Sequence, residues 1–157
     1  MRYLTTPMLS MLLLVGVAQA KSLEDYLKEA QIEYTKLESG ELKIPVTLDN
    51  DTVVVIAKEG AIGDGTVDSL KLFHFYTLVT EVPKGTPIPP EMLKKMAEIN
   101  DQLLVGRVSL GSENLIFYSS SMWQTQATAE LVIQELVLAH IQRGQAKKAL
   151  DPFVQEG

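Results

Sequence analysis

The sequence predicts an α+β domain in which about three helices cover an antiparallel sheet of about five strands. Apolar residues recur every three or four positions in three segments, as in amphipathic helices, and alternate with polar residues in the segments between them, as in strands. The predicted order is α-β-β-β-α-β-β-α, in which helices and antiparallel strands form separate layers. The composition agrees, because 46% hydrophobic and 22% charged residues are typical of a globular domain.

The first twenty residues have the three parts of a secretory signal peptide. Arg2 gives a positive start, residues 8–17 form an apolar run, and Ala18 and Ala20 form a small-residue cleavage site. We expect cleavage after Ala20, because a helix that crosses a membrane needs about 20 apolar residues and this run is much shorter. No later segment is long enough to span a membrane. The mature protein is therefore expected in the periplasm or outside the cell.

The N-terminal part of the mature chain predicts one short helix and two strands. Ser22 precedes residues 23–30, whose apolar side chains fall on one helical face. The apolar residues then alternate over residues 32–34 and, after a Ser-Gly turn, over residues 42–48. Pro45 cannot donate a ladder hydrogen bond, so this second strand is expected at an edge of the sheet or is broken locally.

Two longer strands are expected next. Residues 53–57 form a continuous apolar and β-branched run, which is typical of a strand buried on both faces. After a glycine-rich loop from Gly60 to Asp68, residues 70–82 carry apolar side chains on both faces of a strand. That pattern indicates a central position in the sheet.

The second half of the chain predicts a helix, a hairpin and a long helix. Prolines concentrated before residue 91 open a helix over residues 91–104. Residues 105–110 and 114–122 alternate and form a hairpin. The last helix is expected over residues 125–142.

The limits of the domain follow from the signals at the ends of that last helix. Thr125 is expected to cap its start and Gly144 to close it. The prediction is therefore a single domain over residues 21–143 and a C-terminal tail over residues 144–157.

Two segments of this domain carry a family resemblance. Residues 92–100 read Met-Leu-Lys-Lys-Met-Ala-Glu-Ile-Asn, and residues 105–110 read Val-Gly-Arg-Val-Ser-Leu. With the order of elements over most of residues 23–141, they resemble the YbjN domain family, whose fold is similar to that of type III secretion chaperones. The resemblance implies a non-enzymatic, dimeric module that binds other proteins.

Charge and cysteine content exclude several functions. The chain has 20 acidic and 14 basic residues and a net charge of −6, so it lacks the broad positive field that a nucleic-acid backbone requires. Without cysteine it cannot have a thiol nucleophile, a thiolate metal site or a lipid-modified cysteine. No nucleic-acid partner is expected.

No catalytic residue, metal site or cofactor is predicted. His74 and His140 lack a second ligand at a metal-binding spacing, so both are interpreted as structural. Residues 119–121 are three serines, but no Gly-x-Ser-x-Gly motif surrounds them and they continue a strand.

The loop from Gly60 to Asp68 gives an alternative hypothesis. Its backbone amides could bind an anion, and Asp64 with Asp68 could bind a calcium ion. The loop has neither the Gly-Lys-Ser/Thr ending of a P-loop nor the spacing of a calcium loop, which favours a simple connection. A small-ligand-binding protein or a hydrolase of the cell envelope that uses this loop is the second hypothesis.

The last helix gives the strongest indication of a partner, because it is apolar over more than one stripe. One side is needed to cover the sheet. The other side is predicted to bind a second subunit or a client through Trp123, Leu131, Val132, Leu138 and Ile141, or else to lie beneath the first helix or the tail. The sequence thus predicts an exported, non-enzymatic, chaperone-like or adaptor-like module that binds a protein partner.

Overall fold

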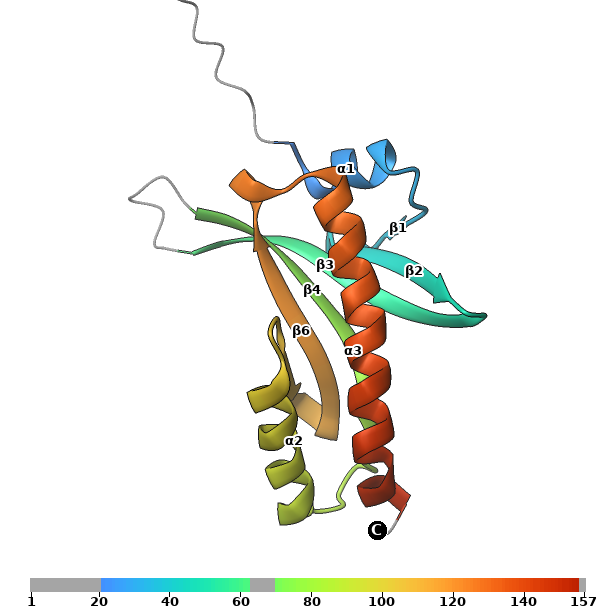
Figure 1. The fold of residues 1–157 in the computed structure, drawn as a ribbon, viewed down its shortest axis with the longest axis vertical. Helices are drawn as coiled ribbons and strands as arrows, with labels where there is room; N and C mark the ends of the chain where they lie inside the picture. The colour runs from blue at the N-terminus through green and yellow to red at the C-terminus, as the bar shows by residue number, and fades with distance from the viewer. Residues whose placement is uncertain (1–20, 63–69, 156–157) are drawn as a thin grey trace, which may run out of the picture.

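The computed structural model describes residues 21–62 and 70–155. It confirms an α+β fold, with one sheet and three helices (Figure 1). The helices are α1 (Leu23–Glu29), α2 (Pro90–Gln102) and α3 (Ala129–Gln155), and the strands are β1 (Thr35–Lys36), β2 (Leu42–Leu48), β3 (Asp51–Ile62), β4 (Leu70–Glu81), β5 (Arg107–Leu110) and β6 (Leu115–Trp123). Within the described ranges, no helix is long and apolar enough to cross a membrane.

The strands form one antiparallel sheet in the order β1-β2-β3-β4-β6-β5. β4 lies between β3 and β6, which confirms the central position predicted for residues 70–82. β5 and β6 form the predicted hairpin, and β5 lies at the edge because β6 pairs with β4. The sheet has six strands, close to the predicted number of about five. The strand expected over residues 32–34 is displaced and short, because only the two-residue β1 (Thr35–Lys36) forms at the other edge.

The position of Pro45 in strand β2 agrees with the expectation that it lies where no neighbouring strand needs a backbone N–H from this residue. β1 pairs only with Leu42 and Lys43, so Pro45 lies where β2 has no outer neighbour among the described strands. Asp49 and Asn50 join β2 to β3 with φ values of 50° and 68°. Two consecutive positive φ values are typical of a type I′ hairpin turn.

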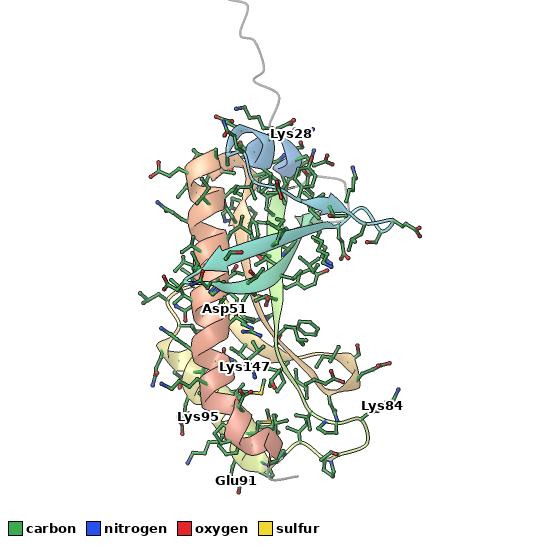
Figure 2. All side chains as sticks on the ribbon, turned by 90° about the vertical axis from the view of Figure 1, so that its right-hand side faces the viewer. Lys28, Asp51, Lys84, Glu91, Lys95 and Lys147 are labelled. Carbon is green, nitrogen blue, oxygen red and sulfur yellow. The ribbon has the colours of Figure 1, made fainter. Side chains whose placement is uncertain are left out.

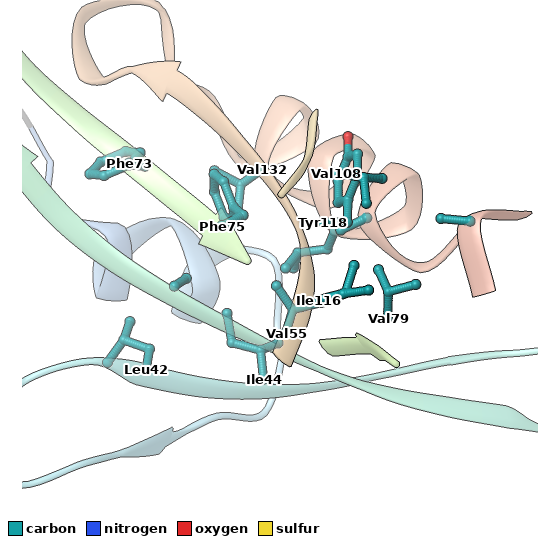
Figure 3. Close-up of a cluster of buried hydrophobic side chains, with 14 of the residues drawn as sticks. Leu42, Ile44, Val55, Phe73, Phe75, Val79, Val108, Ile116, Tyr118 and Val132 are labelled. Atoms are coloured by element: carbon teal, nitrogen blue, oxygen red, sulfur yellow. The ribbon is translucent and has the colours of Figure 1, made fainter. Parts of the chain in front are cut away.

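The hydrophobic core lies between one face of the sheet and all three helices. The strands contribute alternate residues, and the helices cover them with buried residues such as Leu27, Met92 and Leu136. Figure 3 shows part of this cluster, including Ile44 of β2 and Phe75 of β4. In the side view of Figure 2, α3 runs along one side of the sheet. None of the three helices covers the opposite face, which is called the open face below.

The expectation that residues 53–57 are buried on both faces is wrong. Val53, Val55 and Ala57 point into the core, whereas Val54 on the open face is exposed. A continuous apolar run places apolar side chains on both faces of a strand, but helices cover only one face of β3. The apolar side chains on the other face therefore lie on the open face.

Asn100 of α2 binds the backbone of the edge strand β5. Its Nδ2 donates to the Val108 carbonyl oxygen at 2.9 Å, and the Val108 N–H donates to its Oδ1 at 2.7 Å. The side-chain amide thus makes the two hydrogen bonds that a neighbouring strand would make there. This contact fixes the C-terminal end of α2 against the sheet.

Helix α3 differs from the prediction at both ends. It begins at Ala129, where Thr128 Oγ1 accepts a hydrogen bond from the Leu131 N–H at 3.2 Å, and not at Thr125. It continues past Gly144 to Gln155, so most of the expected tail over residues 144–157 is helical. The reason is tertiary packing, because Ala146 and Leu150 lie buried in the core. The packed part of the chain therefore extends beyond residue 143.

We expect Gly144→Ala to raise the free energy of unfolding by about 0.8–1 kcal/mol, the difference in helix propensity between the two residues. Gly144 is an exposed helical residue, and an added Cβ would meet no atom within 4 Å. Urea unfolding of the purified domain measures the change. Gly40→Ala is the control, because Gly40 has equally open space but a φ of +86°, so alanine there should destabilise. A loss of stability in Gly144→Ala would contradict the continuous helix.

Candidate partner-binding surfaces

The outer side of α3 carries several apolar residues in its N-terminal half. Leu131, Ile133 and Ile141 are between 38% and 42% exposed, and Val137 and Leu138 are half-buried. These five residues are called the α3 stripe below. Since Val132, Leu136 and Ala139 already occupy the side of the helix that faces the sheet, the apolar residues outside it have no core to cover.

The structure divides the predicted surface into separate parts. Leu131, Leu138 and Ile141 belong to the α3 stripe. Val132 is wrong as a surface residue, because it is 0% exposed and lies in the core. Trp123 is exposed, but it pairs with Leu72 on the open face, away from α3.

Ile133 was not among the predicted surface residues, although it is as exposed as Leu131. The signal was present in the sequence. Val132, Leu136 and Ala139 have the 4-then-3 spacing of a core-facing stripe, which would have placed Val132 inside and Ile133 outside.

A buried carboxylate lies between α3 and the sheet. Glu135 is buried, and its Oε1 has no hydrogen-bond partner in the described structure. Burial raises the pKa of Tyr118 on β6, and the charge of Glu135 raises it further. The Tyr118 hydroxyl therefore stays protonated, and it donates to the Val105 carbonyl oxygen at 3.1 Å.

The open face carries a second candidate surface. The strand register places Lys43, Ile56, Tyr76, Ser119 and Arg107 in one row across five neighbouring strands. The adjacent row contains Lys58, His74 and Ser121. Between them is an open hollow of about 660 Å³, lined by Lys58, His74, Phe75, Tyr76, Gly106, Arg107, Ser109, Phe117, Ser119, Ser120 and Ser121.

Tyr76 is held firmly at this hollow. Its hydroxyl donates to the Glu41 carboxylate at 2.6 Å, its ring meets that of Phe117 edge to face at 6.3 Å, and Lys58 Nζ lies 5.8 Å from the ring centre. Burial raises the pKa of Tyr76 well above its ordinary value, and the hydrogen bond to Glu41 adds to the shift. The Tyr76 hydroxyl is thus a neutral donor whose hydrogen bond is already made to Glu41.

His74 and Ser121 lie side by side in the hollow, with Nδ1 and Oγ 2.8 Å apart. A serine nucleophile needs a histidine that a further group orients. The other nitrogen of His74 instead lies against Gly60, where an added Cβ would be 2.8 Å from Nε2. The pair has the geometry of a strand-to-strand hydrogen bond and lacks the third member of a triad among the described residues.

The remaining predicted sites have simple positions. His140 is buried, and its Nε2 lies 3.0 Å from the Asp51 carbonyl oxygen. Asp51 is labelled in Figure 2 and begins β3. Within the described ranges, no cluster of three or more His, Asp or Glu side chains could hold a metal ion. Asp64 and Asp68 lie outside the described residues, and Gly60 belongs to β3.

Solved structures with a similar fold include chains from two chaperone complexes. A chain of the HopA1–SchA chaperone–effector complex matches with a TM-score of 0.52 and 12% identity, over 80% of this chain and 90% of that chain. A chain of the complex between the Yersinia pestis type III secretion chaperone SycH and a stable fragment of YscM2 has a TM-score of 0.45 and 16% identity, over 81% and 95%. The first of these matches shows that the fold is type III secretion chaperone-like.

No protein-family model matches the chain, and no curated protein sequence matches it. Membership of the YbjN family therefore stays a prediction. The chaperone-like fold agrees with the fold that this resemblance implied. At 12% identity, the likeness of fold does not identify any binding-site residue in this chain. The candidate surfaces described above are therefore based only on the geometry of this structure.

Proposed function

We propose that this chain is an exported, non-enzymatic protein-binding module of chaperone-like or adaptor-like type. The observation that carries the proposal is the α3 stripe, an apolar surface on a helix whose other side already covers the sheet. Several exposed or half-buried aliphatic side chains on one helix are the kind of surface that soluble proteins use for binding. The chaperone-like fold supports the same class of function.

The partner is a protein that offers apolar side chains to a helix. Leu131, Leu138 and Ile141 are aliphatic, and burying such side chains contributes about 25 cal/mol per Å² of apolar area removed from water. Because exposed polar residues such as Gln134 and Gln145 lie among them, the surface can remain hydrated when no partner is bound. This combination suits reversible binding.

Export is part of the proposal. The segment ending at Ala18 and Ala20 has the form of a cleaved signal, and Lys21 directly after it is tied to the domain. The Lys21 carbonyl oxygen accepts a hydrogen bond from Gln124 Nε2 at 2.8 Å, and Lys21 Nζ pairs with Glu29 at 2.6 Å. We expect the mass of the protein purified from the cell envelope to match a chain that begins at Lys21. The full-length mass would contradict cleavage.

The binding proposal is tested by crosslinking in the cell, with the chain expressed with its own N-terminus and then analysed by mass spectrometry. We expect a reproducible protein partner whose yield falls at least tenfold in Ile141→Asp. Leu93→Asp on α2 is the matched control, because Leu93 is 46% exposed and Ile141 42%. The control should keep the partner.

Two results would contradict this proposal. One is a partner that is retained in Ile141→Asp while circular dichroism shows the fold intact. The other is recovery of the unmodified chain alone. Light scattering of the purified protein shows whether the crosslinked partner is a second copy of the chain.

A further inference from the structure

The hollow on the open face is lined by cations in a negatively charged protein, and the carboxylate beside it, Glu41, already accepts a hydrogen bond from Tyr76. The cations that line it are Lys58 and Arg107, and none of the residues that line it is acidic. In the whole chain acidic residues outnumber basic ones by 20 to 14. Neither Lys58 nor Arg107 forms a salt bridge with a described acidic residue. These cations are therefore available to an external anion.

The same face is also apolar. Val54, Leu78 and Trp123 are exposed there. Phe117 pairs with Leu78, and Ile56 lies in the next row towards Trp123. A group that binds this face must accordingly bring apolar atoms as well as negative charge. Inorganic anions bring no apolar atoms.

The positions of the cations set the size of the occupant. Lys43 on β2 and Arg107 on β5 are the two ends of one row, four strand spacings apart. At about 4.8 Å per spacing they are separated by roughly 19 Å along the sheet. An extended polypeptide rises about 3.3 Å per residue, so about six residues span the row. A small organic anion reaches only one end.

A nucleic acid fits this face poorly. Its backbone carries a charge at every phosphate and requires a continuous run of cations, whereas the row has the uncharged residues Ile56, Tyr76 and Ser119 between its charged ends. The net charge of −6 also repels a polyanion as it approaches.

We infer that the open face binds an extended segment of a partner protein with acidic residues at its two ends and apolar residues between them. This inference rests on the proposed function, because it names the chemistry of a partner segment. Its acidic ends lie at Lys43 and at Arg107, and its apolar centre lies on Ile56 and Phe117. Lys58 and the Ser119 and Ser121 hydroxyls line its path.

The test uses a fluorescein-labelled peptide, Glu-Glu-Leu-Phe-Val-Leu-Glu-Glu, and fluorescence anisotropy with the purified mature chain. We expect saturable binding that weakens as salt is added and that is at least tenfold weaker in Arg107→Glu. Lys94→Glu is the matched control, because Lys94 is an exposed lysine on α2, on the helical side of the sheet. It should bind as the unmodified chain does. A peptide with lysine in place of each glutamate should not bind.

Three outcomes would overturn the inference: no saturable binding of the acidic peptide, equal binding of the lysine peptide, or equal affinity in Arg107→Glu with the fold intact. Displacement of the peptide by free glutamate at equal carboxylate concentration would also overturn it, because a small anion would then suffice. The proposed function is tested separately, by the crosslinking experiment with Ile141→Asp. If the peptide does not bind but that crosslink behaves as expected, only the inference on the open face falls.

Discussion

Leu150→Ala is expected to lower the free energy of unfolding by about 3 kcal/mol, within the range for large-to-small substitutions in protein cores. Leu150 is fully buried in the core cluster although it lies in the segment predicted as a tail. The truncation removes apolar contacts and leaves a cavity that the end of α3 fills only in part. Urea unfolding followed by circular dichroism measures the change.

Lys148→Ala is the control for this substitution, because Lys148 is exposed on the same part of α3. Its effect should stay within about 0.5 kcal/mol, as for most surface substitutions. Similar small effects of both variants would mean that residues 144–155 are dispensable. That result would restore the sequence-based boundary at residue 143.

Gly106→Ala is expected to destabilise the domain by about 3 kcal/mol, from a left-handed backbone and from overpacking. Gly106 has a φ of +77°, and an added Cβ would lie 2.5 Å from the Tyr118 hydroxyl oxygen and 2.7 Å from the Ser119 carbonyl oxygen. The carbonyl belongs to the backbone of β6 and cannot move without disturbing the sheet. Thermal unfolding of the purified variant measures the loss.

Gly40→Ala separates the two causes. Gly40 has a similar φ of +86° but nothing within 4 Å of an added Cβ, so only the backbone effect of about 1–2 kcal/mol applies. An equal loss in both variants would show that the contact with Tyr118 and Ser119 contributes nothing.

Most of the elements follow from periodicity. The α+β class, the central strand over residues 70–82 and the hairpin of β5 and β6 were all predictable, because each depends on residues close together in the sequence. The end of α3 was not. Gly144 resembles a helix terminator, but it has no left-handed backbone, and the buried residues Ala146 and Leu150 hold the helix beyond it.

The candidate surfaces were less predictable for a different reason. The sequence shows how many apolar residues α3 carries, but not which of its sides is covered by the sheet, so Val132 and Ile133 were not told apart. The open-face row depends on a register between strands far apart in the sequence. Ser119 comes next to Tyr76 only when β6 pairs with β4, and no local pattern specifies that pairing.

The amide of Asn100 makes the two edges of the sheet unequal. It occupies the outward N–H and carbonyl of Val108 on β5, whereas β2 beyond Lys43 has no described strand beside it. An exposed strand edge can recruit further chains, and stacking of many molecules requires a free edge on both sides of each one. With Val108 occupied, an added strand finds fewer free backbone groups at β5 than at β2. The contact of Asn100 with β5 therefore opposes the edge-to-edge stacking that growth into fibres requires.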